Sequence, residues 1–126
     1  MTQKFNPVGW FEIPVTNMQR AKDFYQTMLG VTLEEHQMED IEMAWFPMPE
    51  ETYYGATGSL VKGKNCTPST DGVLIYFSAP DLDAAVQRAG ENGGSVLQER
   101  TSIGEFGFIA IVRDTEGNRI GLHCQE

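Results

Sequence analysis

Apolar residues recur at helical spacing in two segments of the chain. In the first segment they stand at i, i+3, i+4, i+7 and i+8, which predicts a helix with a single buried face. These residues are Ala21, Phe24, Tyr25, Met28 and Leu29. A second segment predicts the same kind of face from Leu82, Ala85, Val86 and Ala89. We therefore expect two amphipathic helices, one in each half of the chain.

Residues that begin and end helices flank both segments. Asn17 and Asp81 stand just before them, where a side-chain oxygen can accept hydrogen bonds from the free N–H groups of the first turn. Gly30 can end the first helix in the left-handed conformation, and the glycine pair at 93–94 can end the second. We expect the two helices to lie between these residues.

The remaining apolar stretches are short and bounded by turn residues, which is typical of β-strands. We expect strands at 8–15, 31–36, 43–48, 58–61, 73–79, 95–99, 106–113 and 119–124. The sequence DTEGN at 114–118 predicts the turn between the last two strands, with Gly117 at positive φ. Each half of the chain is thus expected to fold as a strand, a helix and three further strands.

This order of elements occurs twice because the chain repeats itself weakly. Segments 11–33 and 75–97 align without a gap, so that Asn17 falls on Asp81 and Gly30 falls on Gly94. We predict one α+β domain over residues 1–126, with module one at about 6–63, a linker at 64–71 and module two at about 72–125. Neither half is large enough to bury much apolar surface alone, so the two sheets should pair around a shared interior.

Composition narrows the class of protein. With 126 residues, of which 40% are apolar, the chain can build a real core. The net charge of −9 argues against a nucleic-acid or anionic-membrane partner, because phosphate groups repel an acidic surface. No stretch approaches the roughly 18 apolar residues of a membrane span, and no signal peptide is visible, so we expect a soluble cytoplasmic protein. Cys66 and Cys124 match no zinc or redox spacing and are expected to be reduced.

The paired strand–helix–three-strand pattern resembles the vicinal oxygen chelate superfamily, which includes glyoxalase I, bleomycin-resistance proteins and extradiol dioxygenases. The resemblance is carried by EIPVTNMQRAKDFYQTMLG at 12–30 and IGEFGFIAIVRDTEGNRIGLH at 103–123, and it covers nearly the whole chain. It implies two tandem βαβββ modules that form a curled, U-shaped mixed sheet around a cavity. It also implies a small-molecule ligand or substrate and a homodimer.

The resemblance further implies where a metal ion would bind. Members of the superfamily hold a divalent metal through residues on the first and last strands of each module, and the metal acts on substrate oxygens as a Lewis acid. Carried over to this sequence, those positions are Trp10, Ser59, Leu74 and Gly121. Trp, Ser, Leu and Gly side chains do not form a site for such a metal. We therefore predict that the usual metal ligands are missing and that the protein has no cofactor.

Side chains two residues apart on a strand share a face, which extends the carry-over to a candidate cavity. Glu12, Tyr76 and His123 stand two residues beyond three of the carried-over positions and should point inward with them. The predicted ligand-binding residues are Trp10, Glu12, Trp45, Phe46, Leu74, Tyr76, Phe108, Gly121 and His123. Aromatic faces would hold the ligand, while Glu12 and His123 would orient it or act as a general acid–base pair.

Two functions stay open at this point. The first is binding of a small organic molecule without turnover. The alternative is an enzyme similar to lactoylglutathione lyase or to a dioxygenase, with an unrecognised metal site or with acid–base catalysis by Glu12 and His123. Plainer roles also stay open, since Glu12 can be a salt-bridged carboxylate and His123 can bond to backbone, while Trp10 and Tyr76 can be core residues. His36, in the acidic sequence EEHQMED, is expected at a solvated edge.

Overall fold

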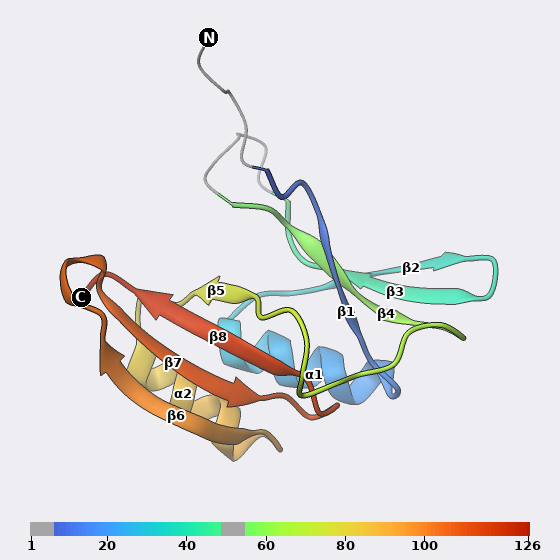
Figure 1. Ribbon diagram of the computed structural model, residues 1–126. Helices are drawn as coiled ribbons and strands as arrows, with labels where there is room; N and C mark the ends of the chain where they lie inside the picture. The colour runs from blue at the N-terminus through green and yellow to red at the C-terminus, as the bar shows by residue number, and fades with distance from the viewer. Residues whose placement is uncertain (1–6, 49–54) are drawn as a thin grey trace, which may run out of the picture.

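The computed structural model describes residues 7–48 and 55–126 and confirms the α+β fold (Figure 1). Module one contains β1 (Phe11–Pro14), α1 (Met18–Leu29), β2 (Glu34–Met38), β3 (Ile41–Trp45) and β4 (Gly58–Lys62). Its strands form a four-stranded sheet in the order β1-β4-β3-β2. The β1–β4 pair is parallel, whereas the other two pairs are antiparallel.

Module two repeats this arrangement. It contains β5 (Tyr76–Ser78), α2 (Leu82–Glu91), β6 (Ser95–Ser102), a 3₁₀ turn η1 (Gly104–Phe106), β7 (Phe108–Arg113) and β8 (Arg119–Cys124). The strand order is β5-β8-β7-β6, with a parallel β5–β8 pair. Within the described residues no ladder joins β1 to β5, so each of these strands is an edge and the sheets do not close. We call the gap between β1 and β5 the seam.

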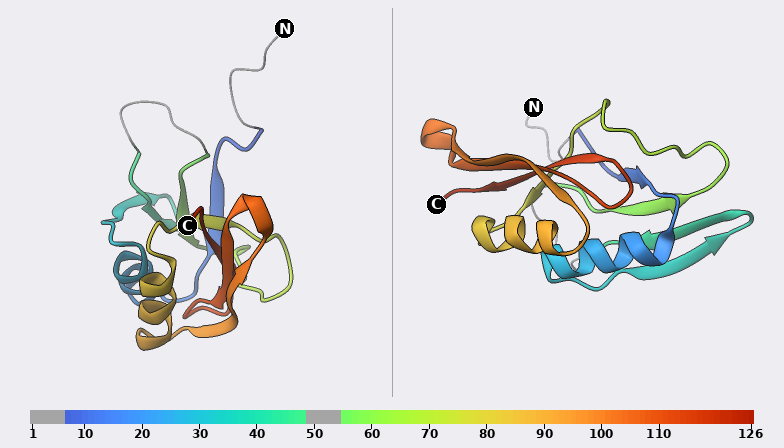
Figure 2. Two further views of the ribbon diagram at one scale, coloured as in Figure 1. Left: turned by 90° about the vertical axis from the view of Figure 1, so that its left-hand side faces the viewer. Right: turned by 90° about the horizontal axis from the view of Figure 1, so that it is seen from below.

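The molecule has two layers. Both helices lie on the same side of the two sheets, and the connection between β4 and β5 runs along the opposite side (Figure 2). We call the side away from the helices the open face of each sheet. Alternation along the strands therefore directs every second side chain to the helices and the others to an open face. Neither of the two described helices is long and apolar enough to span a membrane.

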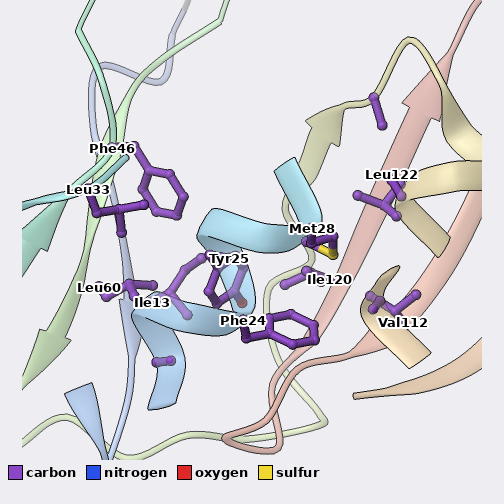
Figure 3. Packing of buried hydrophobic residues seen from close by; sticks show 14 of the residues in the cluster. Ile13, Phe24, Tyr25, Met28, Leu33, Phe46, Leu60, Val112, Ile120 and Leu122 are labelled. Atoms are coloured by element: carbon purple, nitrogen blue, oxygen red, sulfur yellow. The ribbon is translucent and has the colours of Figure 1, made fainter. Parts of the chain in front are cut away.

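The core crosses from one module to the other through α1. Phe24, Tyr25 and Met28 lie between side chains of module one, such as Phe46, and side chains of module two, such as Leu122 (Figure 3). Aromatic rings continue this packing, with centroids about 5–6 Å apart as is typical of edge and tilted contacts. They belong to Phe11, Phe24, Tyr25, Phe46 and Phe77. Because each fully buried large apolar side chain contributes about 1.5–3 kcal/mol, this cluster is a main reason why the modules stay together.

The predicted helix caps are confirmed with one small change. Asn17 accepts a hydrogen bond from Arg20 N at 3.0 Å, and Gly30 ends α1 in the left-handed conformation at φ 68°. Asp81 likewise accepts from Ala84 N at 3.2 Å. The second helix is capped by Asn92, one residue before the predicted glycine pair.

The strand limits differ more from the prediction. Strands expected at 8–15 and 73–79 contain ladder residues only at 11–14 and 76–78. The residues before each strand are coil, whereas Val15 and Ala79 after them are buried. The strands expected at 31–36 and 43–48 lie at 34–38 and 41–45. The strand expected from Phe106 begins at Phe108, since η1 precedes it. Gly107, at φ 104° and packed against the Cys124 carbonyl, separates the two elements.

The DTEGN turn ties module two to module one. Asp114, only 3% exposed, accepts at Oδ1 from the backbone N–H groups of Glu116 and Asn118, each at 2.8 Å. Its Oδ2 accepts from the Tyr25 hydroxyl of α1 at 2.5 Å and from Asn118 Nδ2 at 3.0 Å. Asn118 Nδ2 also donates to the Pro14 carbonyl of β1 at 2.7 Å. Burial and the charge of Asp114 raise the pKa of Tyr25 well above its ordinary value, so the hydroxyl stays a donor.

Glu116 of the same turn binds the start of α1. Its Oε1 accepts from the backbone N–H groups of Thr16 and Asn17, each at 2.8 Å, and its Oε2 accepts from Arg20 Nε at 2.7 Å. Burial would raise the pKa of this carboxyl, but the hydrogen bonds from Arg20 and the two backbone groups outweigh it and lower the pKa to about 2. The positive end of the helix dipole also favours a carboxylate here. We call Asp114, Glu116 and Asn118, with Tyr25 and Arg20, the joint.

Candidate functional site

The seam holds a cavity of about 1170 Å³, which is large enough for a drug-sized molecule. β1 and the residues before it form one wall, and β5 with the end of the β4–β5 connection forms another. Trp10, Glu12, Leu74 and Tyr76 all line this seam cavity, so the structure brings these four sequence-predicted residues together. Arg119 of β8 lines it as well.

Two aromatic side chains are exposed at the seam. Trp10 is 37% exposed and Tyr76 is 46% exposed, although large aromatic residues are usually well buried. Trp10 directly precedes β1 in module one, and Tyr76 is the first residue of β5 in module two. The interpretation of Trp10 and Tyr76 as core residues is therefore wrong, and their ring surfaces are open to a ligand.

Tyr76 explains the glycine at position 121. β5 and β8 pair with Tyr76 opposite Gly121, and the Tyr76 ring covers the glycine so closely that an added Cβ would lie 2.4 Å from Tyr76 Cδ1. Gly121 was predicted to be one of the ligand-binding residues. It instead makes room for the tyrosine ring, because only a residue without a side chain allows this approach.

The four carried-over metal positions do not fit a metal ion. Trp10 and Leu74 carry no ligating atom, and the side-chain space at Gly121 is filled by Tyr76. Ser59 is fully buried, and its hydroxyl has no hydrogen-bond partner among the described residues. In residues 7–48 and 55–126, no three His, Cys, Asp or Glu side chains gather closely enough to hold a metal.

Glu12 and His123 are not hydrogen-bonded to each other. Glu12 is exposed on β1 at the cavity. His123 lies on β8, where its Nε2 is 2.7 Å from the Phe106 carbonyl oxygen, and it is not among the residues that line the cavity. His123 thus bonds to backbone, which is one of the roles that the sequence allowed for it. Glu12 and His123 have no direct path for proton transfer between them in this arrangement.

The remaining predicted ligand-binding residues lie away from the open part of the cavity. Trp45 shares the open face with Trp10, and the two rings meet edge to face with centroids 5.4 Å apart. Phe46 is 6% exposed and packs in the core on the helix side, although it also lines the cavity. Phe108 also faces the helices and carries the Arg100 guanidinium 4.0 Å above its ring. Ser59 pairs with Glu12 on one side and with Trp45 on the other, which places Trp45 rather than Phe46 on the face of Trp10.

Sequence reasoning missed two features near the site. His36 stacks on Trp45 with centroids 3.9 Å apart, and its Nε2 lies 2.8 Å from Glu34 Oε1, although the angle is poor for a hydrogen bond. It is half-buried, and not simply part of a solvated edge. Arg113 and Arg119 face each other across β7 and β8. The DTEGN turn fixed that register, and pairing the residues on either side of it would have found the two arginines.

Comparison with known proteins shows which family the chain belongs to. The model of the Glyoxalase/Bleomycin resistance protein/Dioxygenase superfamily matches residues 7–122. The chain belongs to this superfamily. The resemblance inferred from the sequence is thus confirmed over most of the domain.

Three similar proteins show what the chain resembles. A glyoxylase-like domain-containing protein of Didymella fabae is 29% identical over 118 residues, which are 88% of each chain. The glyoxylase/bleomycin resistance protein/dioxygenase domain from Frankia sp. EAN1pec is 16% identical with a TM-score of 0.74, covering 98% of this chain and 100% of that one, and it supports the fold alone. TnmS3, an antibiotic binding protein from Streptomyces sp. CB03234, is 26% identical with a TM-score of 0.64, covering 99% and 100%.

Proposed function

We propose that the protein binds a small organic molecule in the seam cavity, and that it does so without a metal ion at the positions Trp10, Ser59, Leu74 and Gly121. The observation that carries this proposal is the pairing of a large cavity with exposed aromatic rings, Trp10 and Tyr76, on opposite modules. Ligand pockets combine apolar and aromatic walls with a few polar groups, and this lining has that character.

The metal-free part of the proposal rests on the contents of the four positions. A Lewis acid for oxygen substrates needs carboxylate, imidazole or similar ligands, and the tyrosine ring at Gly121 fills the space where a longer side chain would have to lie. The likeness to an antibiotic binding protein supports a role in holding an organic molecule.

We extend the proposal to a homodimer. β1 and β5 are both edge strands, and apolar residues such as Val73 and Phe106 are strongly exposed. Exposed edges and apolar patches of this kind are typical of surfaces that meet another chain. Light scattering after size-exclusion chromatography should give twice the mass of one chain, and a monomer at all concentrations would contradict this part only.

The first test is elemental analysis of the untreated protein by mass spectrometry. We expect no stoichiometric transition metal. One equivalent per chain would contradict the metal-free proposal and would favour the enzymatic alternative with an unrecognised site.

The second test uses the two tryptophans of the chain, Trp10 and Trp45, as reporters. Compounds are screened for a change in fluorescence with Trp45→Phe, which retains only the tryptophan at the cavity, and with Trp10→Phe as the matched control. Binding in the seam should change the signal of the first variant much more than that of the second. A compound recovered chemically altered would show turnover and would move the protein to the enzymatic alternative.

A further inference from the structure

Two arginines face each other on the open side of module two. β7 and β8 are antiparallel with Arg113 directly opposite Arg119, so both side chains leave the same face of the sheet. Their neighbours Val112 and Ile120 are buried in the core on the helix side. The alternation of the strands therefore places Arg113 and Arg119 on the open face, where both are half-buried.

This arrangement has a cost that the described residues do not offset. Like charges directly opposite on neighbouring strands destabilise a sheet. Four other cations of the chain lie in ion pairs, and Arg88 donates to the Met28 carbonyl. The paired cations are Arg20, Lys22, Lys62 and Arg100. Neither Arg113 nor Arg119 makes an ion pair with, or donates a side-chain hydrogen bond to, any residue that the structure describes.

Arg119 connects the pair to the seam cavity, which Arg113 itself does not line. Arg119 lines the cavity, and Glu12 is the other charged residue among the described lining residues. The walls are otherwise apolar or neutral, with the rings of Trp10 and Tyr76 exposed. One corner of the cavity is thus cationic, while its other walls suit a flat apolar body.

The negative net charge of the protein makes the cationic corner of the cavity a specific sign of anion binding. At −9 the protein repels anions in general, so a bound anion needs local cations to hold it. A guanidinium group presents planar donors that match carboxylate, sulfonate or phosphate oxygens, and such charge-assisted hydrogen bonds are among the stronger polar contacts. An anionic group would also remove the repulsion between the two arginines.

We propose that the ligand of the seam cavity is a flat apolar molecule that carries an anionic group. The anion binds between Arg113 and Arg119, and the apolar body lies against Trp10 and Tyr76. This inference rests on the proposed function and names the chemical class of its ligand.

A pair of fluorescent probes separates the two parts of the inference. Anilinonaphthalene sulfonate and phenyl-naphthylamine share an aromatic skeleton, but only the first carries an anion. We expect the wild-type protein to bind the sulfonate at least about tenfold more tightly, because a hydrogen-bonded charge is worth about 1.5–3 kcal/mol. The relevant variants are Arg113→Gln, Arg119→Gln and Trp10→Ala, with Lys64→Gln as the control that removes the same charge from the linker.

Each arginine variant should weaken the sulfonate probe about tenfold and leave the neutral probe within about twofold. Urea denaturation of each variant checks that it is folded, because partly folded chains also bind hydrophobic probes. Trp10→Ala should weaken both probes about fivefold, because it removes aromatic contact with the shared skeleton. Lys64→Gln should change neither.

The outcomes distinguish a wrong ligand class from a wrong site. If Trp10→Ala weakens both probes but the arginine variants do not weaken the sulfonate, this inference is wrong and the proposed function stands. If neither probe binds, or if Trp10→Ala affects neither, the proposed function fails and this inference fails with it. If the arginine variants instead convert a dimer to a monomer, the pair belongs to an interface between copies, and the inference is overturned.

Discussion

The joint and the seam cavity both lie between the two modules, yet the charged groups of the joint have partners and those of the cavity do not pair with any described residue. At the joint, Asp114 accepts four hydrogen bonds and Glu116 accepts five, so both carboxylates are fully satisfied. At the cavity, Glu12 and Arg119 make no ion pair with any described residue. Buried polar groups are stable only with partners, whereas groups at binding sites keep capacity for a ligand.

This contrast separates residues that hold the fold from residues that are available for binding. The joint fixes how β1 and α1 lie against the last hairpin, and of its five residues Asn118 also lines the cavity. Substitutions at the joint should lower the free energy of unfolding, and substitutions at the cavity should change affinity with little effect on folding.

The largest expected effect is at Asp114. Its replacement by alanine leaves the Tyr25 hydroxyl and two backbone N–H groups of the turn without their acceptor in a buried place. We expect Asp114→Ala to lower the free energy of unfolding by about 3–5 kcal/mol, measured by urea denaturation. Asp71→Ala, an exposed aspartate in the linker, is the control and should cost less than about 0.5 kcal/mol. Equal effects at the two positions would mean that the joint does not hold the modules together.

Glu116→Gln tests the same joint through its charge. The variant keeps the shape but weakens the hydrogen bonds from Arg20 and from the start of α1, so we expect a loss of about 1–2 kcal/mol at pH 7. The folded pKa of about 2 lies below the ordinary value of 4.5. The stabilisation from this carboxylate is therefore complete above pH 4.5 and is lost as the pH falls from 4.5 to 2.

The wild-type protein and Glu116→Gln should therefore converge in acid. Their difference in unfolding free energy, followed by urea titrations in a pH series, should shrink as the pH falls through that interval. A difference that stays constant down to pH 2 would show that the charge of Glu116 contributes nothing to folding.

These two regions also differ in how well the sequence predicted them. Helices, caps and element order follow from local spacing, so Asn17, Gly30 and Asp81 were found in their expected roles. The joint was not found, because Glu116 meets the start of α1 from about a hundred residues away and nothing local records that contact. Within the site, Trp10, Glu12, Leu74 and Tyr76 followed from strand alternation carried over from the superfamily.

The prediction was incomplete where pairing between strands or the direction of a large side chain decides the outcome. The pattern along β3 left both Trp45 and Phe46 as candidates, and the pairing of Trp45 with Ser59, itself opposite Glu12, decides that Trp45 lies on the open face. Gly121 was assigned to ligand space because the strand pattern does not reveal that the Tyr76 ring folds over it. The direction of a large side chain depends on packing between strands, and the pattern of residues along one strand does not predict that packing.

A smaller effect is expected where the cavity meets the sheet, at Gly121. In Gly121→Ala the new Cβ would collide with the Tyr76 ring, which has to turn away, so we expect a loss of about 1 kcal/mol. In a Tyr76→Ala background this cost should largely disappear, and a double-mutant cycle by denaturation measures the coupling. Additive effects would show that the ring does not occupy the space above the glycine.

The smallest effect on folding is expected at Glu12. Its side chain is exposed and has no ion pair among the described residues, so Glu12→Gln should change the free energy of unfolding by less than about 0.5 kcal/mol. The same change removes a negative charge from the cavity that Arg119 lines. The sulfonate probe should then bind about twofold more tightly, while the neutral probe should be unaffected.

Glu99→Gln is the matched control for this experiment, because it removes one exposed carboxylate that does not line the cavity. It should leave the affinity for both probes unchanged. If Glu12→Gln lowered stability by more than about 2 kcal/mol, Glu12 would belong with the joint as a structural carboxylate. If it changed stability little but also left sulfonate binding unchanged, the anion would have to bind far enough from β1 that water and salt screen the charge of Glu12.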